Sequence, residues 1–194
     1  MIVTPGEKHG PPSDAIVLFD GSDFSKWSGS DVEVQWKIKG KAMEVVRGAG
    51  NIKTVQPFGN VQLHIEWRTP EKIENKDYRG QLRGNSGEFL MGLYEIQVLD
   101  SWENETYYNG QAGSIYKQHI PLVNACRKPG EWQTYDIIFR IPEFNEDKTL
   151  KNLAYITVIH NGILIQDHVE LKGPTVYVGY PEYHYHESKL PILL

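Results

Sequence analysis

The residues with the clearest potential for chemistry lie in one short stretch of the chain. Tyr94–Asp100 reads Tyr-Glu-Ile-Gln-Val-Leu-Asp and follows a Gly-Asn-Ser-Gly segment. Because side chains alternate along a strand, Glu95 and Gln97 are expected on one face, opposite the apolar residues between them. A β-bulge at Val98–Leu99 would bring Asp100 onto that face. Two carboxylates and an amide on one strand surface could provide the general acid and general base that cleave a bond between sugars.

A solvated strand face with incidental polar residues is the alternative. The glycines around Asn85 favour a binding surface, because they let the backbone pass close to a ligand and the Asn85 amide both donates and accepts hydrogen bonds. His64 and Glu66 lie on the polar face of an expected strand, where they would line a sugar site or meet water. Tyr116 and Trp132 are candidates for stacking on a sugar ring or for packing in the core.

Composition narrows the class of protein. A chain of 194 residues fits one domain with a substantial core. A net charge of −5 without a run of Lys or Arg argues against nucleic acid or anionic lipid as partner. No apolar stretch of about 18 residues is present, so no membrane span is expected. The first residues lack an apolar signal core, so the chain is either cytoplasmic or is periplasmic or secreted after removal of a signal peptide.

Metal and cofactor motifs are absent from the sequence. Cys126 is the single cysteine, which excludes an internal disulfide and a cysteine-rich metal site. His184 and His186 have the spacing of a metal-ligand pair but no evident third ligand. We therefore expect neither a metal nor another cofactor, and the oligomeric state stays open.

Strand signals recur along the chain without a convincing helical period. Residues 1–12 are rich in Pro and Gly and are expected to form an extended arm before a domain that spans 13–194. The pattern predicts an antiparallel all-β sandwich, a jelly roll, in a single domain. The expected strands and hairpins are Ala15–Phe19, 36–46, Val61–Trp67, two segments within 88–99, Thr134–Ile141 and a hairpin over 155–167 around Asn161-Gly162.

Several motifs together resemble the 3-keto-disaccharide hydrolase family. They follow that family's order and spacing at 13–21 with Trp27, 63–68, 83–87, 94–100, 111–116 and 130–132. The resemblance implies a concanavalin-like jelly roll and an exported protein of a carbohydrate-degrading bacterium. The sequence departs from the family at Glu88, where members usually carry an aliphatic residue. It also ends at Leu194, before a segment and a final strand that the family has, so we expect that strand to be missing here.

The resemblance implies cleavage of a glycoside that is oxidised at C3, with a small molecule such as a disaccharide, or an oligosaccharide, as substrate. Its ketone acidifies the C2 hydrogen, so that proton removal, elimination of the glycosidic oxygen and addition of water give net hydrolysis. We expect Glu95 to be the base, with a pKa raised by a neighbouring acid such as Asp100, which would itself be the acid or an orienting group. Gln97 and Asn85 would contact the sugar or the enolate, and His64, Glu66, Tyr116 and Trp132 would complete the substrate site.

Two other functions are compatible with the same fold. A non-catalytic carbohydrate-binding module predicts aromatic platforms and tolerance of a Glu95→Gln substitution. A conventional glycosidase predicts two carboxylates at a fixed separation across the scissile bond, and turnover of an unoxidised disaccharide.

Overall fold

The protein is nearly all β. Its computed structural model describes residues 2–7, 10–29, 33–73 and 75–194, which form two compact units, Met1–Gln56 and Pro57–Leu194. Among these residues the helical pieces are two short 3-10 turns, η1 (Gly80–Leu82) and η2 (Tyr108–Gly110). The prediction of an all-β fold is confirmed, whereas the boundary of the arm at residue 12 stays a prediction.

The first unit consists of two small strand pairs. β1 (Trp27–Gly29) pairs with β4 (Ile52–Thr54), and β2 (Lys37–Lys39) with β3 (Ala42–Glu44). The β2–β3 hairpin was predicted. The predicted strand at Ala15–Phe19 is wrong, because that segment is a loop whose carbonyls accept hydrogen bonds from side chains instead of a strand ladder. One of these bonds joins Trp27 Nε1 to the Leu18 oxygen at 2.8 Å.

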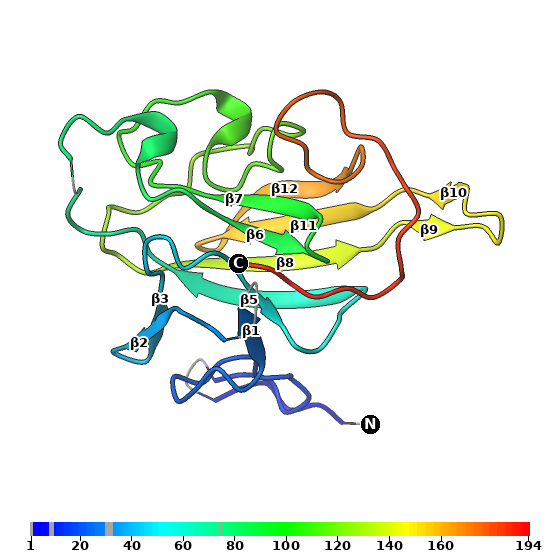
Figure 1. Ribbon diagram of the computed structural model, residues 1–194, viewed down its shortest axis with the longest axis horizontal. Helices are drawn as coiled ribbons and strands as arrows, with labels where there is room; N and C mark the ends of the chain where they lie inside the picture. Colours follow the sequence, from blue (N-terminus) through cyan, green and yellow to red (C-terminus); the bar gives the residue numbers. More distant parts are fainter. Residues whose placement is uncertain (1, 8–9, 30–32, 74) are drawn as a thin grey trace. The chain divides into compact units, whose positions relative to one another are not determined.

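A four-stranded antiparallel sheet forms one layer of the second unit (Figure 1). Its strand order is β12 (Ile163–Glu170), β11 (Tyr155–His160), β8 (Gln133–Arg140), β5 (Val61–Trp67). β5 has the predicted bounds, and the β11–β12 hairpin turns at Asn161-Gly162 as expected, with φ angles of 53° and 80°. Alternation on β8 buries every second residue, which gives the sheet one apolar face.

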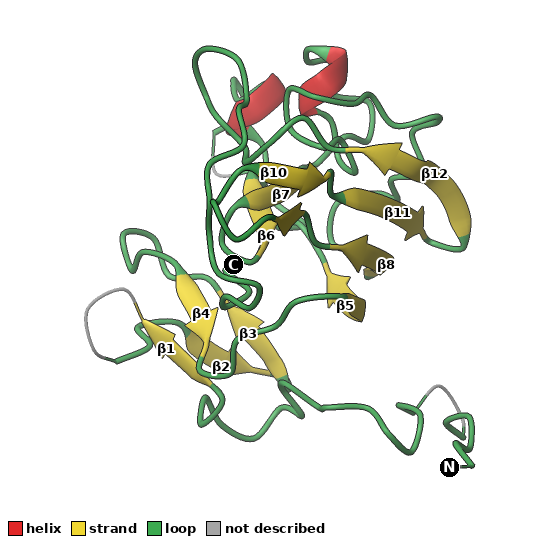
Figure 2. Cartoon of the chain, turned by 90° about the vertical axis from the view of Figure 1, so that its right-hand side faces the viewer, coloured by secondary structure: helices red, strands yellow, loops and turns green. Residues whose placement is uncertain are grey.

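The second layer is built around the hairpin of β6 (Ser86–Leu90) and β7 (Tyr94–Val98). Short segments extend it on both sides: Ile115 bridges to Ile96, and Leu193 bridges to Phe89. The short pair β9 (Glu143–Phe144) and β10 (Leu150–Asn152) follows β8. In Figure 2, η1 and η2 lie together at one end of this unit, and Gln81 Nε2 donates to the Gly110 oxygen at 2.6 Å between them.

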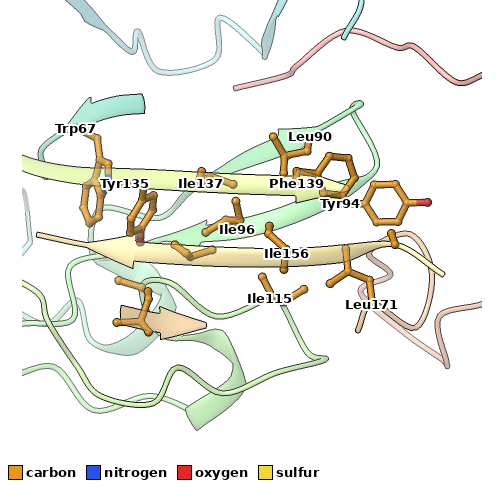
Figure 3. Packing of buried hydrophobic residues seen from close by; sticks show 14 of the residues in the cluster. Trp67, Leu90, Tyr94, Ile96, Ile115, Tyr135, Ile137, Phe139, Ile156 and Leu171 are labelled. Atoms are coloured by element: carbon orange, nitrogen blue, oxygen red, sulfur yellow. The ribbon is translucent and has the colours of Figure 1, made fainter. Parts of the chain in front are cut away.

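The hydrophobic core fills the space between the two layers (Figure 3). Tyr94 and Ile96 of β7 meet Ile137 and Phe139 of β8, and the Tyr94 and Phe139 rings lie 5.4 Å apart. Because one strand face is committed to this core, the register of β7 is fixed, and Glu95 and Gln97 must lie on its opposite face.

Candidate active site

The outer face of the β6–β7 hairpin carries the candidate active site. Glu95 is directly opposite Phe89 on β6, and Gln97 is opposite Gly87. On the other side of β7 the backbone N–H of Tyr116 donates to the backbone carbonyl oxygen of Glu95 at 3.3 Å. Residues opposite each other in an antiparallel pair point to the same face, so these side chains surround Glu95. Both polar side chains of β7 are buried, with Glu95 9 % exposed and Gln97 1 %.

The Glu95 carboxyl group lies over Gly87. A Cβ atom on that glycine would be 2.7 Å from Glu95 Oε1 and 2.7 Å from the Phe89 ring, so only glycine leaves room for the carboxylate here. Among the described residues no hydrogen-bond donor or cation contacts the carboxylate oxygens of Glu95. Burial raises the pKa of Glu95 to about 7. A carboxylate with this pKa and no partner is suited to accept a proton near neutral pH.

Gln97 and Asn85 fix the turn that precedes the site. Gln97 Nε2 donates to Asn85 Oδ1 at 3.0 Å and to the Ser86 oxygen at 2.7 Å. The Asn85 amide in turn donates to the Gln81 oxygen at 3.1 Å. These contacts bring both predicted amides to the Glu95 face and hold the glycine-containing strand against it.

Asp100 forms a buried ion pair instead of a carboxylate pair with Glu95. Its carboxylate accepts a hydrogen bond from Arg83 Nη2, and its side chain is 3 % exposed. Burial is the cause of the raised Glu95 pKa, so the predicted contribution of a neighbouring acid such as Asp100 is wrong. The alternation does break where we expected, but β7 ends at Val98 and no bulge lies within its ladder.

His64, Glu66 and Trp132 lie on a different surface, the outer face of the four-stranded sheet. His64 Nδ1 is 2.6 Å from Asp136 Oδ1, and both side chains are about half exposed. Trp132 stacks under the Arg68 guanidinium, 5.0 Å from the ring centre. The core separates this face from Glu95, so the structure does not bring these three residues to the other site residues.

Glu88 points into the core between the layers. It is opposite Ile96 and therefore shares the apolar face of the hairpin. The side chain is 1 % exposed, and neither carboxylate oxygen has a hydrogen-bond partner among the described residues. Burial raises the pKa of Glu88 to about 8. Glu88 thus neither adds charge to the site nor points outward.

A shallow hollow of about 490 Å³ lies beyond the site. Its lining is polar and consists of Ser101, Glu103, Asn104, Glu105, Gln111 and Asn124, without Glu95. The amides of Asn104 and Asn124 already donate to backbone oxygens, so this surface is largely occupied with its own loops. No group of three or more His, Cys, Asp or Glu side chains in the described part of the chain is arranged to hold a metal ion.

Comparison with protein families matches residues 14–194 to the 3-keto-alpha-glucoside-1,2-lyase-like domain. The chain belongs to this family. The family resemblance inferred from the sequence motifs is therefore confirmed, and one family domain spans both compact units.

Two solved structures are similar to this 3-keto-glucoside lyase-like chain. A protein of Parabacteroides distasonis named as a candidate glycosyl hydrolase is 47 % identical, with a TM-score of 0.89 over 94 % of this chain and 76 % of that one. A second such protein of that organism is 17 % identical, with a TM-score of 0.60 over 92 % and 85 % of the two chains, and shows likeness of fold alone. Comparison with curated proteins found no match. Among the described residues no helix is long and apolar enough to span a membrane.

Within this lyase-like domain, the sequence did not predict two features of the site. The space above Gly87 was not foreseen, although a glycine flanking Asn-Ser was noted. The contact between Tyr107 and Tyr116, whose hydroxyl oxygens lie 2.7 Å apart, was not foreseen either. The pairing joins two loop segments, and no periodic pattern reports such a contact. Several tyrosines near position 110 were the only available signal.

Proposed function

We propose that this domain cleaves the glycosidic bond of 3-keto-glycosides, with 3-keto-disaccharides as the natural class of substrate. Family membership supports a glycoside-acting enzyme of the 1,2-lyase type. The relative of 47 % identity, named as a candidate glycosyl hydrolase, supports the same class of substrate. The observation that carries the proposal is the Glu95 carboxylate, which is buried, without a partner and close in pKa to neutral pH.

The reaction begins with removal of the C2 proton by Glu95. The electron pair of the C2–H bond enters the adjacent ketone as an enolate, which is feasible because the C3 carbonyl acidifies that hydrogen. The ketone then re-forms, a C1=C2 double bond appears, and the C1–O bond breaks with departure of the second sugar. Addition of water across the double bond completes a net hydrolysis. The atoms balance without an oxidant or reductant.

The environment of Glu95 favours this base role. Burial destabilises its charged form, and accepting the C2 proton relieves that penalty. Gly87 leaves room for the carboxylate on this face, and the exposed Asn85 side chain lies beside it as a group for contacts to the sugar, held in place by Gln97.

A conventional glycosidase would need a second carboxylate facing Glu95. Such enzymes place two carboxyl groups roughly 5–10 Å apart across the scissile bond. No second acid contributes to the pKa of Glu95, Asp100 is paired with Arg83, and Glu88 lies on the core face. These placements favour the elimination route, for which a single base at C2 is sufficient at the first step.

The test is turnover of a 3-keto-disaccharide and of its unoxidised parent by the wild-type chain and by Glu95→Gln. We expect cleavage of the keto sugar alone, with a loss of about a hundredfold or more in kcat for the variant. Glu146→Gln, which removes an exposed carboxylate of the β9–β10 hairpin, is the matched control and should retain full activity.

Three results would contradict the proposal. Cleavage of the unoxidised parent would indicate a conventional glycosidase. Binding of either sugar without cleavage would indicate a carbohydrate-binding module. Full activity of Glu95→Gln would remove this residue from the role of base.

A further inference from the structure

Tyr116 is a hydroxyl-bearing residue that lies opposite Glu95 across the strand ladder. Ile115 and Ile96 form an antiparallel bridge, which puts Tyr116 opposite Glu95 and on the same face. The charge of Glu95 is also one of the influences on the Tyr116 hydroxyl, so the two groups interact through space. The outer face of β7 therefore carries a carboxylate and a phenol side by side.

Tyr116 shares its hydroxyl with Tyr107. The two oxygens are 2.7 Å apart, within hydrogen-bond distance. The pair owns two hydroxyl protons and uses one between its oxygens, so the second is free for another acceptor. Tyr116 is 8 % exposed and Tyr107 41 %, so the pair extends from the Glu95 face toward solvent.

The surroundings of Tyr116 favour the protonated form of its hydroxyl. Burial and then the hydrogen bond to Tyr107 hold the pKa of Tyr116 well above its ordinary value. The Lys117 ammonium lies over both rings, with its Nζ atom 5.7 Å from the Tyr116 ring centre and 5.9 Å from that of Tyr107.

The proposed elimination needs a proton donor that Glu95 and Asp100 do not supply. The departing sugar oxygen is strongly basic if it leaves as an alkoxide, and protonation as the C1–O bond breaks lowers that barrier. Glu95 is occupied by the C2 proton at that moment. The Asp100 carboxylate is held by Arg83 in a buried ion pair, so it is already engaged with another group.

We propose that the Tyr107–Tyr116 hydroxyl pair protonates the leaving glycosidic oxygen during the elimination. This inference rests on the proposed function and assigns its missing acid. The pair gives one proton to the oxygen as the C1–O bond breaks, and one phenolate remains. The proton that Glu95 took from C2 returns to that phenolate through water, so the enzyme ends in its starting protonation state.

Leaving-group dependence provides the test. Tyr107→Phe and Tyr116→Phe are measured on a 3-keto-disaccharide and on 4-nitrophenyl 3-keto-glucoside. A nitrophenolate leaves without protonation near neutral pH, whereas a sugar alkoxide does not. We expect each variant to lose about a hundredfold in kcat on the disaccharide and no more than a few-fold on the nitrophenyl substrate.

Tyr108→Phe is the matched control, because this neighbouring tyrosine is 72 % exposed and its hydroxyl makes no hydrogen bond with the described residues. It should match the wild type on both substrates. Thermal unfolding of each variant shows whether it has folded.

The outcomes separate this inference from the proposed function. Equal losses on both substrates would assign the tyrosines a merely structural role and overturn the inference, as would no loss on either. If wild type cleaves both substrates and Glu95→Gln neither, the proposed function stands whatever the tyrosine variants show. If wild type cleaves neither, the proposed function fails and the tyrosine assignment fails with it.

Discussion

Glu88 and Glu95 are two buried carboxyl groups on opposite faces of one β-hairpin. Burial raises the pKa of both, to about 8 for Glu88 and about 7 for Glu95. Glu88 faces the core beside Ile96, whereas Glu95 faces Tyr116 and the space above Gly87. A raised pKa therefore marks burial in both cases, and only the accessible group has neighbours that suit chemistry.

The different positions of Glu88 and Glu95 predict that one affects the stability of the fold and the other affects activity. Glu88 carries an unsatisfied polar group in a close-packed core, which costs folding free energy and offers no route to a substrate. Glu95 is 9 % exposed, and its carboxylate lies over Gly87, where the missing Cβ leaves room for it. Substitutions at the first position should thus alter unfolding, and those at the second should alter turnover.

Glu88→Leu should have the largest effect, a gain of about 3–5 kcal/mol in the free energy of unfolding at pH 8. Leucine removes the unpartnered carboxyl group and contributes apolar contacts. The folded-state pKa of about 8 lies above the ordinary 4.5, so the stability that protonation provides is complete below about pH 4.5 and is lost as the pH rises through 8.

Urea unfolding at pH 6.5 and pH 8 tests this sign. Buried His160, with its pKa lowered to about 4 from 6.5, opposes the trend as the pH falls through 6.5, but it does so equally in variant and wild type and cancels in their difference. The advantage of the variant over wild type should grow by about 2 kcal/mol across this pH window, while the Glu95 contribution cancels. An equal advantage at both pH values, or a loss of stability, would show that Glu88 does not titrate in the core.

Gly87→Ala should affect activity by displacing Glu95, the carboxyl group on the outer face of the hairpin. Its new Cβ would come within 2.7 Å of Glu95 Oε1 and displace the base, which should cost on the order of a hundredfold in kcat. The clash should be smaller when the carboxylate is shorter, so Gly87→Ala should cost much less in a Glu95→Asp background. Equal losses in both backgrounds would mean that the alanine acts through Phe89 or the fold rather than through Glu95.

Local alternation allowed much of the fold and part of the site to be predicted. β5, β8 and the β11–β12 hairpin follow from period-two patterns and a strong turn. The same alternation put Glu95 and Gln97 on one face. The same alternation could also have predicted that Glu88 faces the core, because Leu90, two residues later on the same strand face, is apolar and buried.

The remaining features depend on contacts between distant segments. Alternation on β5 shows that His64 and Glu66 share a face, but not that this face belongs to the other layer. Asp100 has an acidic side chain next to the strand, and only the folded chain pairs it with Arg83. Ala15–Phe19 has strand-like composition, yet no neighbouring strand pairs with it in the described part of the chain.

The smallest effect concerns the pH dependence of activity and links both carboxyl groups. Only ionised Glu95 accepts a proton, so kcat/KM on a 3-keto-disaccharide should fall about tenfold per pH unit below about pH 7. Glu88→Gln should not change the pH at which kcat/KM decreases, because Glu88 lies on the core face and makes no contact with the reacting atoms. A decrease that moves to another pH in Glu88→Gln, or one centred near the ordinary 4.5, would mean that the buried pKa of Glu95 does not control the reaction. If the decrease in kcat/KM stays near pH 7 in Glu88→Gln, the burial of Glu95, and not that of Glu88, is the one that serves catalysis.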